Sequence, residues 1–172
     1  RVSRARRPSV NEYAFLAVAR NGAAFKGTHF RLNSLPAGAS LEGYLFPDTY
    51  RIASTATVTD VIETLLNRFD QQYATFETAV RVPDVSVHQI VTMASIVQRE
   101  ATLQGEMPQI AAVFWNRLRP ENLGQFGGGK LGSDPTVQYL LGQKGSWWPK
   151  LDTLTAEEID KVGANSERYA YN

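Results

Sequence analysis

Residues 58–81 carry the pattern that most constrains this fold, because apolar side chains recur there every three or four residues. This spacing is typical of a helix with one apolar face, which must pack against other elements. Thr57 or Thr59 can cap the start of the helix, and Pro83 lies just beyond its end. The stripe consists of Val58, Val61, Ile62, Leu65, Leu66, Phe69, Tyr73, Phe76 and Val80.

Shorter helices are predicted over residues 10–20, 86–101, 108–118 and 133–141, and after residue 155. Ser86 with Gln89 and Thr155 with Glu158 fit capping boxes at two of the helix starts. Residues 41–52 are rich in aromatic side chains and are predicted to form a strand or extended segment with a Pro-Asp turn. The predicted fold class is α+β, mainly α, with a small β component.

The composition excludes several kinds of site. The chain has no cysteine, which rules out disulfides, a thiol nucleophile and cysteine-bound metals. Its two histidines, His29 and His88, are far apart in sequence, and an ordinary structural role is expected for both. No metal and no cofactor is predicted. No apolar run reaches the ~18 residues that a membrane span needs, and no signal peptide opens the chain.

Positive charge is concentrated at the start of the chain. The net charge is +1, and four arginines within residues 1–7 supply +4, so residues 8–172 carry −3. Residues 1–9 are therefore interpreted as a basic tail or a truncation junction. A weak alternative is that this tail binds nucleic acid, but the acidic remainder argues against nucleic acid as the main partner.

Glu100 is the candidate catalytic residue. On a wheel of about 100° per residue with Val97 at zero, Glu100 lies near −60°, on the apolar side of the helix over 86–101. The expected buried face of this helix consists of Ile90, Met93, Ala94, Val97 and Ala101. Desolvation and the negative end of the helix dipole both favour the protonated carboxyl, which can protonate a leaving oxygen. The structural alternative is an edge residue paired with Arg117 or a lysine.

Cleavage of a glycosidic bond by two carboxylates would need a second acid. The candidates are Glu42, Asp48 and Asp134, each of which lies in a short polar segment beside aromatic residues. Aromatic side chains can stack on sugar rings, although each one taken singly is more often a core or scattered surface residue. The aromatic candidates for a sugar groove are Tyr44, Tyr50, Tyr139, Trp147, Trp148 and Tyr171.

Three segments resemble the YceG-like family of MltG-type endolytic murein transglycosylases. They are Leu-Glu-Gly-Tyr-Leu-Phe-Pro-Asp-Thr-Tyr at 41–50, Met-Ala-Ser-Ile-Val-Gln-Arg-Glu-Ala at 93–101 followed by Val-Phe-Trp-Asn-Arg-Leu at 113–118, and Leu-Gly-Ser-Asp-Pro-Thr-Val-Gln-Tyr at 131–139. The resemblance implies a lysozyme-like catalytic domain over residues 10–172. It also implies non-hydrolytic cleavage of the bond between N-acetylmuramic acid and N-acetylglucosamine in nascent glycan strands, which leaves 1,6-anhydro ends.

The resemblance places the family's acid and base on Glu100 and requires no metal or cofactor. The residues expected to contact substrate are Glu42, Tyr44, Asp48, Tyr50, Asn116, Ser133, Asp134, Thr136, Tyr139, Tyr171 and Asn172. Structural roles remain open for several of them: a turn for Asp48, a helix N-cap for Asp134, and bracing of Glu100 for Asn116 and Arg117.

The chain departs from the family pattern at Gln98, where Glu is frequent, and at Gly132, where Gln is frequent. The expected Gly-Leu-Pro-Pro-Gly region, LysM-like region and membrane helix are absent, so a C-terminally truncated domain is expected. The resemblance implies peptidoglycan strands as the partner, association with cell-wall synthases, and a membrane-anchored parent on the outer face of the cell membrane. The alternatives are a hydrolysing muramidase and a glycan-binding module without catalysis.

Overall fold

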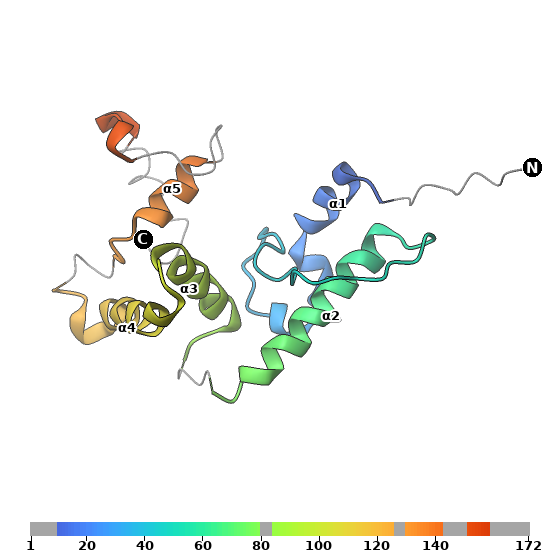
Figure 1. Cartoon of the computed structure of the whole chain (residues 1–172), viewed down its shortest axis with the longest axis horizontal. Coiled ribbons are helices and arrows are strands. Elements are labelled where there is room, and N and C mark those ends of the chain that lie inside the picture. The colour runs from blue at the N-terminus through green and yellow to red at the C-terminus, as the bar shows by residue number, and fades with distance from the viewer. Residues whose placement is uncertain (1–9, 80–83, 126–129, 143–150, 159–172) are drawn as a thin grey trace, which may run out of the picture. The chain divides into compact units, whose positions relative to one another are not determined.

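The computed structural model describes residues 10–79, 84–125, 130–142 and 151–158. Two compact units divide the chain, Arg1–Thr92 and Met93–Asn172 (Figure 1). Within the described residues all regular structure is helical and no strand is present. The predicted α+β class with a small β component is therefore wrong. The single domain predicted over 10–172 stays a prediction.

Residues 41–52 form turns and irregular backbone instead of the predicted strand. The backbone N–H of Tyr44 donates to the carbonyl of Leu41 over 3.0 Å, which closes a turn. Gly43 within this turn has a φ of +84°, a conformation that glycine adopts without strain. A strand also needs a paired neighbour, and no ladder forms within the described residues. Of the aromatic side chains in this segment, Tyr44 is buried against Phe69 of the helix over 58–76, whereas Phe46 and Tyr50 are half-buried.

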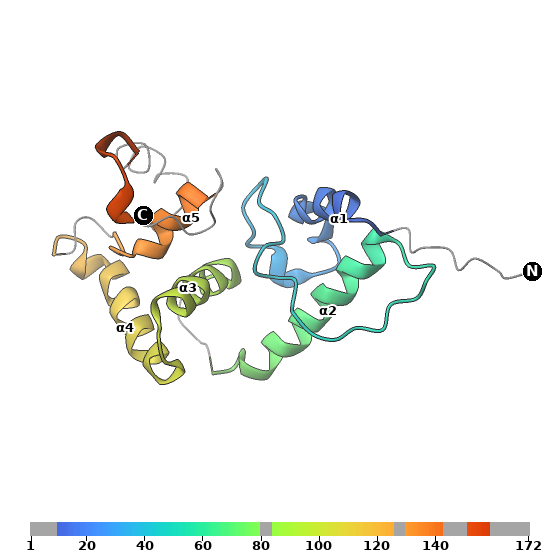
Figure 2. The ribbon, with the colours of Figure 1, turned by 45° about the horizontal axis from the view of Figure 1, so that its top comes forward.

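The first unit contains α1 (Glu12–Ala19), two short 3-10 turns (Gly22–Phe25 and Phe30–Leu32) and α2 (Val58–Phe76). The long helix α2 lies beside α1, as Figures 1 and 2 show. Thr57 and Asp60 form a reciprocal capping box at the start of α2, which confirms one of the two predicted caps. The helix ends at Phe76, five residues earlier than predicted, where 41% of the Phe76 side chain is exposed and burial no longer favours continuation. The buried core of this unit consists of Ala19, Phe25, Leu32, Leu35, Leu41, Tyr44, Ile62, Leu66, Phe69 and Tyr73.

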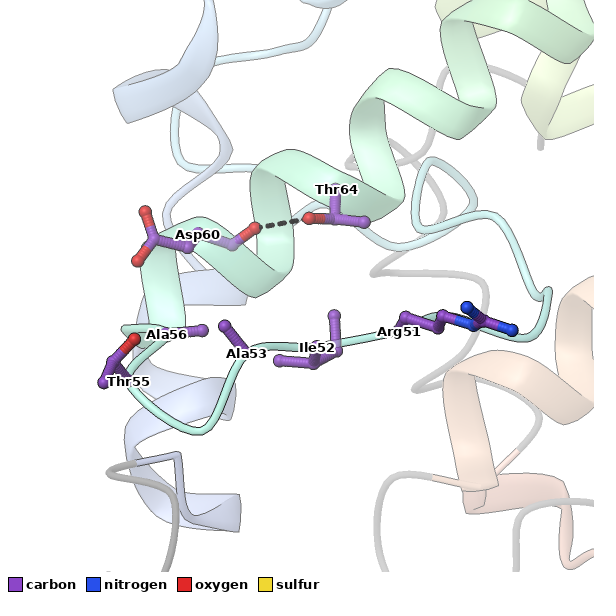
Figure 3. Close-up of a pocket in the computed structure, with 7 residues that line it drawn as sticks. All are labelled: Arg51, Ile52, Ala53, Thr55, Ala56, Asp60 and Thr64. Atoms are coloured by element: carbon purple, nitrogen blue, oxygen red, sulfur yellow. Dashed lines mark hydrogen bonds between the residues drawn. The ribbon is translucent and has the colours of Figure 1, made fainter.

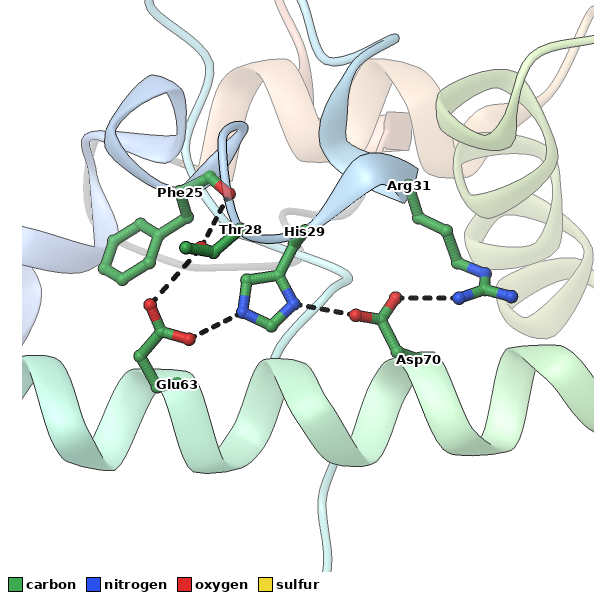
Figure 4. Close-up of polar contacts among 6 residues, drawn as sticks. All are labelled: Phe25, Thr28, His29, Arg31, Glu63 and Asp70. Carbon is green, nitrogen blue, oxygen red and sulfur yellow. Dashed lines mark hydrogen bonds and ion pairs between the residues drawn. The ribbon is translucent and has the colours of Figure 1, made fainter.

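A partly buried ionic network fastens the 3-10 turns to α2 (Figure 4). His29 lies between two carboxylates of α2, with Nδ1 2.7 Å from Asp70 and Nε2 2.7 Å from Glu63. Arg31 bridges Asp70 at 3.2 Å and Glu77 at 2.6 Å. An ionised carboxylate only accepts hydrogen bonds, so a carboxylate at each ring nitrogen favours the imidazolium form of His29, in which both nitrogens donate. The expected structural role of this histidine agrees with its position.

α3 (Val87–Glu100) begins with the predicted capping box, in which Ser86 and Gln89 exchange side-chain and backbone hydrogen bonds of 2.8 and 3.2 Å. His88 near its start bonds the hydroxyl of the buried Tyr44 over 3.1 Å. The second capping box, between Thr155 and Glu158, is also formed. Both helix starts were therefore predicted correctly from local sequence.

The second unit contains the end of α3, α4 (Met107–Leu118), α5 (Asp134–Gly142) and 3-10 turns at Gln104–Glu106, Pro120–Asn122 and Leu151–Thr153. Figure 2 shows α4 beside α3, and their contact forms a second core. This core consists of Met93, Ile96, Val97, Phe114 and Leu131. No helix in the described part of the chain is long and apolar enough to cross a membrane.

Candidate active site

Glu100 is the last residue of α3 and lies on the buried face of that helix. The buried residues of α3 are Met93, Ile96 and Val97. On a wheel of about 100° per residue they lie near −40°, −100° and 0°, so Glu100 near −60° falls between them. Ala94, which the sequence predicted to be buried, is exposed. Glu100 therefore belongs to the buried face of α3, and its side chain is half-buried.

Ser133 is the direct partner of the Glu100 carboxyl. The Ser133 hydroxyl donates a hydrogen bond of 2.5 Å to Oε1 of Glu100, and only 4% of Ser133 is exposed. Oε2 has no hydrogen-bond partner in the described part of the chain. The alternative ion pair between Glu100 and Arg117 is not found there either. One carboxyl oxygen is thus held, while the other is not engaged by the described residues.

The segment that carries Ser133 is fixed on both sides. Before it, Arg117 Nη1 donates to the carbonyl of Leu131, which is buried in the core of the second unit. Gly132 then turns the chain with a φ of +61°. After it, the backbone N–H and the hydroxyl of Thr136 both bond the Ser133 carbonyl, over 3.1 and 2.7 Å. These contacts position the serine independently of Glu100.

The other predicted residues of the second unit have different surroundings. Arg117 acts on the segment before Ser133, whereas Asn116 is exposed and its carbonyl accepts from a side-chain amide. Asp134 is exposed in the first turn of α5, so Ser133 holds the N-cap position that was considered for Asp134. Tyr139 is half-buried on α5. Their predicted contacts with substrate stay predictions.

The predicted residues of the first unit do not form one cluster. Tyr44 has no exposed surface and packs at 5.1 Å, centroid to centroid, against Phe69, a place that suits a core residue. Glu42 is exposed. Tyr50 is half-buried, and its hydroxyl donates to the Phe46 carbonyl over 2.5 Å. Burial raises the pKa of Tyr50, and the nearby carboxylate of Asp48 adds to this rise.

Asp48 is tied to its own loop and to α2. The backbone N–H of Thr49 donates to Oδ1 over 2.8 Å, and Arg68 Nε pairs with Oδ2 at 2.7 Å. These two contacts, with the backbone hydrogen bond the larger cause, lower the pKa of Asp48. The turn-like bond supports the structural alternative for this residue, while its role in substrate binding stays a prediction.

Two open pockets lie between residues 48–56 and α2. One, of about 360 Å³, is lined by Asp48, Thr49, Tyr50, Thr64, Asn67, Arg68 and Gln71. The other, of about 270 Å³, is drawn in Figure 3 and is lined by Arg51, Ile52, Ala53, Thr55 and Ala56 together with Asp60 and Thr64 on α2. Two predicted site residues, Asp48 and Tyr50, line the first pocket and none lines the second.

Four aromatic or polar candidates, Trp147, Trp148, Tyr171 and Asn172, lie outside the described residues. Within the described ranges, no group of three or more His, Cys, Asp or Glu side chains could hold a metal ion. The sequence-based prediction named Ser133 as a substrate contact and missed its bond to Glu100. The sequence did contain a signal for this bond: Ser133 directly precedes a predicted helix and follows the apolar Leu131, so its hydroxyl was a candidate for a buried contact.

Comparison with known proteins gives one family and several relatives. The model of the YceG-like family matches residues 6–172. An endolytic murein transglycosylase of Bacillus subtilis strain 168 is 36% identical over 104 residues, which are 60% of this chain and 27% of that protein. A protein of the same name from Streptococcus pneumoniae serotype 2 strain D39 is 35% identical over 92 residues, which are 51% of this chain and 17% of that protein. No solved structure matches the chain.

Proposed function

This chain belongs to the YceG-like family, and from that premise we propose that it carries the catalytic residue of an endolytic murein transglycosylase, Glu100. The bond from Ser133 to Glu100 is the observation that carries the proposal. The aligned relatives bear the name endolytic murein transglycosylase, and this chain spans about a quarter or less of their length. The activity, substrate and partners of the whole protein are therefore part of the proposal.

The site suits a single group that works first as an acid and then as a base. Glu100 donates its proton to the glycosidic oxygen while the bond from that oxygen to the muramyl anomeric carbon breaks. The muramyl 6-hydroxyl then bonds the anomeric carbon, and Glu100 takes the hydroxyl proton. The carboxyl is thereby restored, no water is consumed, and a 1,6-anhydro end is left.

The same chemistry requires no second carboxylate. Two-carboxylate glycosidases use the second group as a nucleophile or to activate water. In the proposed reaction the substrate's own hydroxyl takes that part, so no second carboxylate is needed beside Glu100, whose partner is Ser133. Asp134, one residue further on, is the candidate second acid if the enzyme instead hydrolyses its substrate.

The proposal extends to the setting of the reaction. Peptidoglycan lies outside the cell membrane, so we place this domain on the outer face of that membrane, in a parent protein that is anchored there. Association with cell-wall synthases and a lysozyme-like catalytic fold belong to the same proposal. Their support is membership of the family, together with the names of the aligned relatives.

The test is mass spectrometry of purified peptidoglycan after incubation with the protein and with a Glu100→Gln variant. We expect 1,6-anhydromuramyl ends, lighter by one water than hydrolysis products, from the unchanged protein and none from the variant. Glu121→Gln is the matched control, because Glu121 is 65% exposed and its pair with Arg119, at 3.8 Å, is a surface pair. This control should cleave like the unchanged protein.

Other outcomes would redirect the proposal. Reducing ends in place of anhydro ends would identify a hydrolase with a second carboxylate. Retained cleavage in the Glu100→Gln variant would remove Glu100 from its proposed role. Binding of glycan strands without cleavage, by a protein that circular dichroism shows to be folded, would favour the glycan-binding module.

A further inference from the structure

We propose that Ser133 is a positioning residue that fixes Oε1 of Glu100 and thereby assigns proton transfer to Oε2. The inference rests on the proposed function and concerns how the catalytic carboxyl is oriented. The sequence alone had placed Ser133 among the residues that contact substrate. Its surroundings in the structure instead direct its hydroxyl at another side chain of the protein.

The hydroxyl of Ser133 is committed to Glu100. Ser133 stands immediately before α5, where a serine side chain ordinarily accepts a hydrogen bond from the first helical turn. In the described part of the chain, however, the Ser133 side chain bonds only the Glu100 carboxyl. The carbonyl of Ser133, and not its hydroxyl, receives the N–H and hydroxyl of Thr136. The side chain is therefore not used to cap the helix that it precedes.

The serine can hold the same contact through the whole reaction. A hydroxyl donates one proton, and Oε1 can accept it whether the carboxyl is ionised or carries its proton on Oε2. Glu100 must occupy both states if it acts as an acid and then as a base. Because the Ser133 bond is compatible with each state, the carboxyl does not have to reorient between the two proton transfers.

The fold sets the place of the serine before Glu100 is considered. Arg117 holds the Leu131 carbonyl, and Leu131 is buried in the core of the second unit. A Cβ atom built on Gly132 would lie 3.3 Å from Arg117 Nη1, so a larger residue at this turn would crowd the arginine. Ser133 itself is nearly inaccessible to solvent. The flexible side chain of Glu100 at the end of α3 is thus oriented by a rigid donor, as preorganised sites require.

The experiment compares Ser133→Ala with Ser133→Thr in the cleavage assay described above. Loss of the hydroxyl in Ser133→Ala should lower kcat by about 10- to 100-fold, the range for a partner that orients a reacting group, and leave KM unchanged. Ser133→Thr keeps the hydroxyl and should recover most of the activity. Thr75→Ala, which removes a hydroxyl from an exposed position on α2, is the control.

A second measurement does not depend on cleavage. With ¹³C-labelled glutamate, the Glu100 carboxyl resonance is identified by its loss in Glu100→Gln, and its chemical shift is compared at one pH in the unchanged protein, in Ser133→Ala and in Ser133→Thr. The resonance should move in Ser133→Ala, because the hydrogen-bond donor to the carboxyl is lost, and return in Ser133→Thr. An unmoved resonance, or Ser133→Ala with full kcat, would overturn the positioning role and leave the proposed function standing. Failure of the unchanged protein to cleave would count against the proposed function alone, because the carboxyl resonance still decides the role of Ser133.

Discussion

Replacing His29 with glutamine should destabilise the first unit by about 3 kcal/mol, the lower end of the range for breaking a buried ion pair. The imidazole is 3% exposed and donates to two carboxylates, whereas a glutamine amide is neutral and cannot donate from two opposed ring positions. The lower end applies because the side chains of Glu63 and Asp70 are 32% and 22% exposed, so water can hydrate them. For a chain of this size such a loss corresponds to a fall in Tm of roughly 6–12 °C.

The effect should depend on pH in a defined direction. Burial by itself lowers the pKa of His29, but hydrogen bonds to Asp70 and Glu63 and the charges of both carboxylates outweigh it and raise the pKa above 6.5. The folded state then binds more protons than the unfolded chain in the interval above pH 6.5. The stabilisation by His29 is therefore complete below pH 6.5 and is lost as pH rises through the raised pKa.

His88 provides the matched control because its pKa is shifted in the opposite direction. Burial lowers the pKa of His88 from 6.5, so the unfolded chain binds the additional proton and stability falls as pH drops below that value. Urea unfolding followed by circular dichroism, from about pH 5.5 to about pH 9, covers both intervals. His29→Gln should abolish the loss at high pH and His88→Gln the loss at low pH.

The ring protons of the two histidines can be titrated by NMR in the same proteins, and either variant assigns both signals. Two results would refute the reasoning. One is a His29 ring that titrates at or below pH 6.5. The other is a His29→Gln variant that unfolds at the same urea concentration as the unchanged protein at pH ~6, where the imidazolium form is expected.

Three further substitutions test other contacts. Thr57→Ala removes the cap of α2 and should cost about 1 kcal/mol in urea unfolding; no change would mean that the capping box contributes nothing. Gly132→Ala forces a residue with a Cβ to a φ of +61° and should cost about 1–2 kcal/mol while lowering cleavage; a neutral result would argue against the turn. Arg117→Met leaves the buried Leu131 carbonyl without this donor and should cost about 1–3 kcal/mol; unaltered amide exchange around residue 131 would contradict it.

The sequence predicted where helices lie better than which way they face. The capping boxes at Thr57 and Ser86 are local, and the structure forms both of them. The predicted buried face of α3 was correct at Met93 and Val97 but wrong at Ala94, which is exposed, and it left out Ile96, which is buried. Alanine adds little to an apolar stripe, so the facing of a helix is decided by the neighbours that it packs against.

Contacts between distant segments had no counterpart in any local pattern. Ser133 and Glu100 are 33 residues apart, and His29 lies 41 residues from Asp70. Periodicity and capping rules report on neighbours within about two helical turns, so they identified Glu100 as unusual without naming its partner. The strand predicted over residues 41–52 was wrong for a related reason. Aromatic side chains favour a strand only where another strand is available for pairing, and Tyr44 is buried without one.

The carboxylates that pair with His29 and Arg31 are Glu63 and Asp70 on α2 and Glu77 directly after its end, and they recur at steps of seven residues. This spacing also limits how far α2 can shift along its axis. Each step of seven residues is about 10.5 Å along the axis and nearly two full turns. An apolar stripe alone tolerates a shift by one turn, because apolar residues recur at that distance. A shift of four residues would bring Asn67 and Ala74 to the places of Glu63 and Asp70, and both cations would lose their partners. The ionic network therefore fixes the position of α2 along its axis, which the apolar stripe alone would not do.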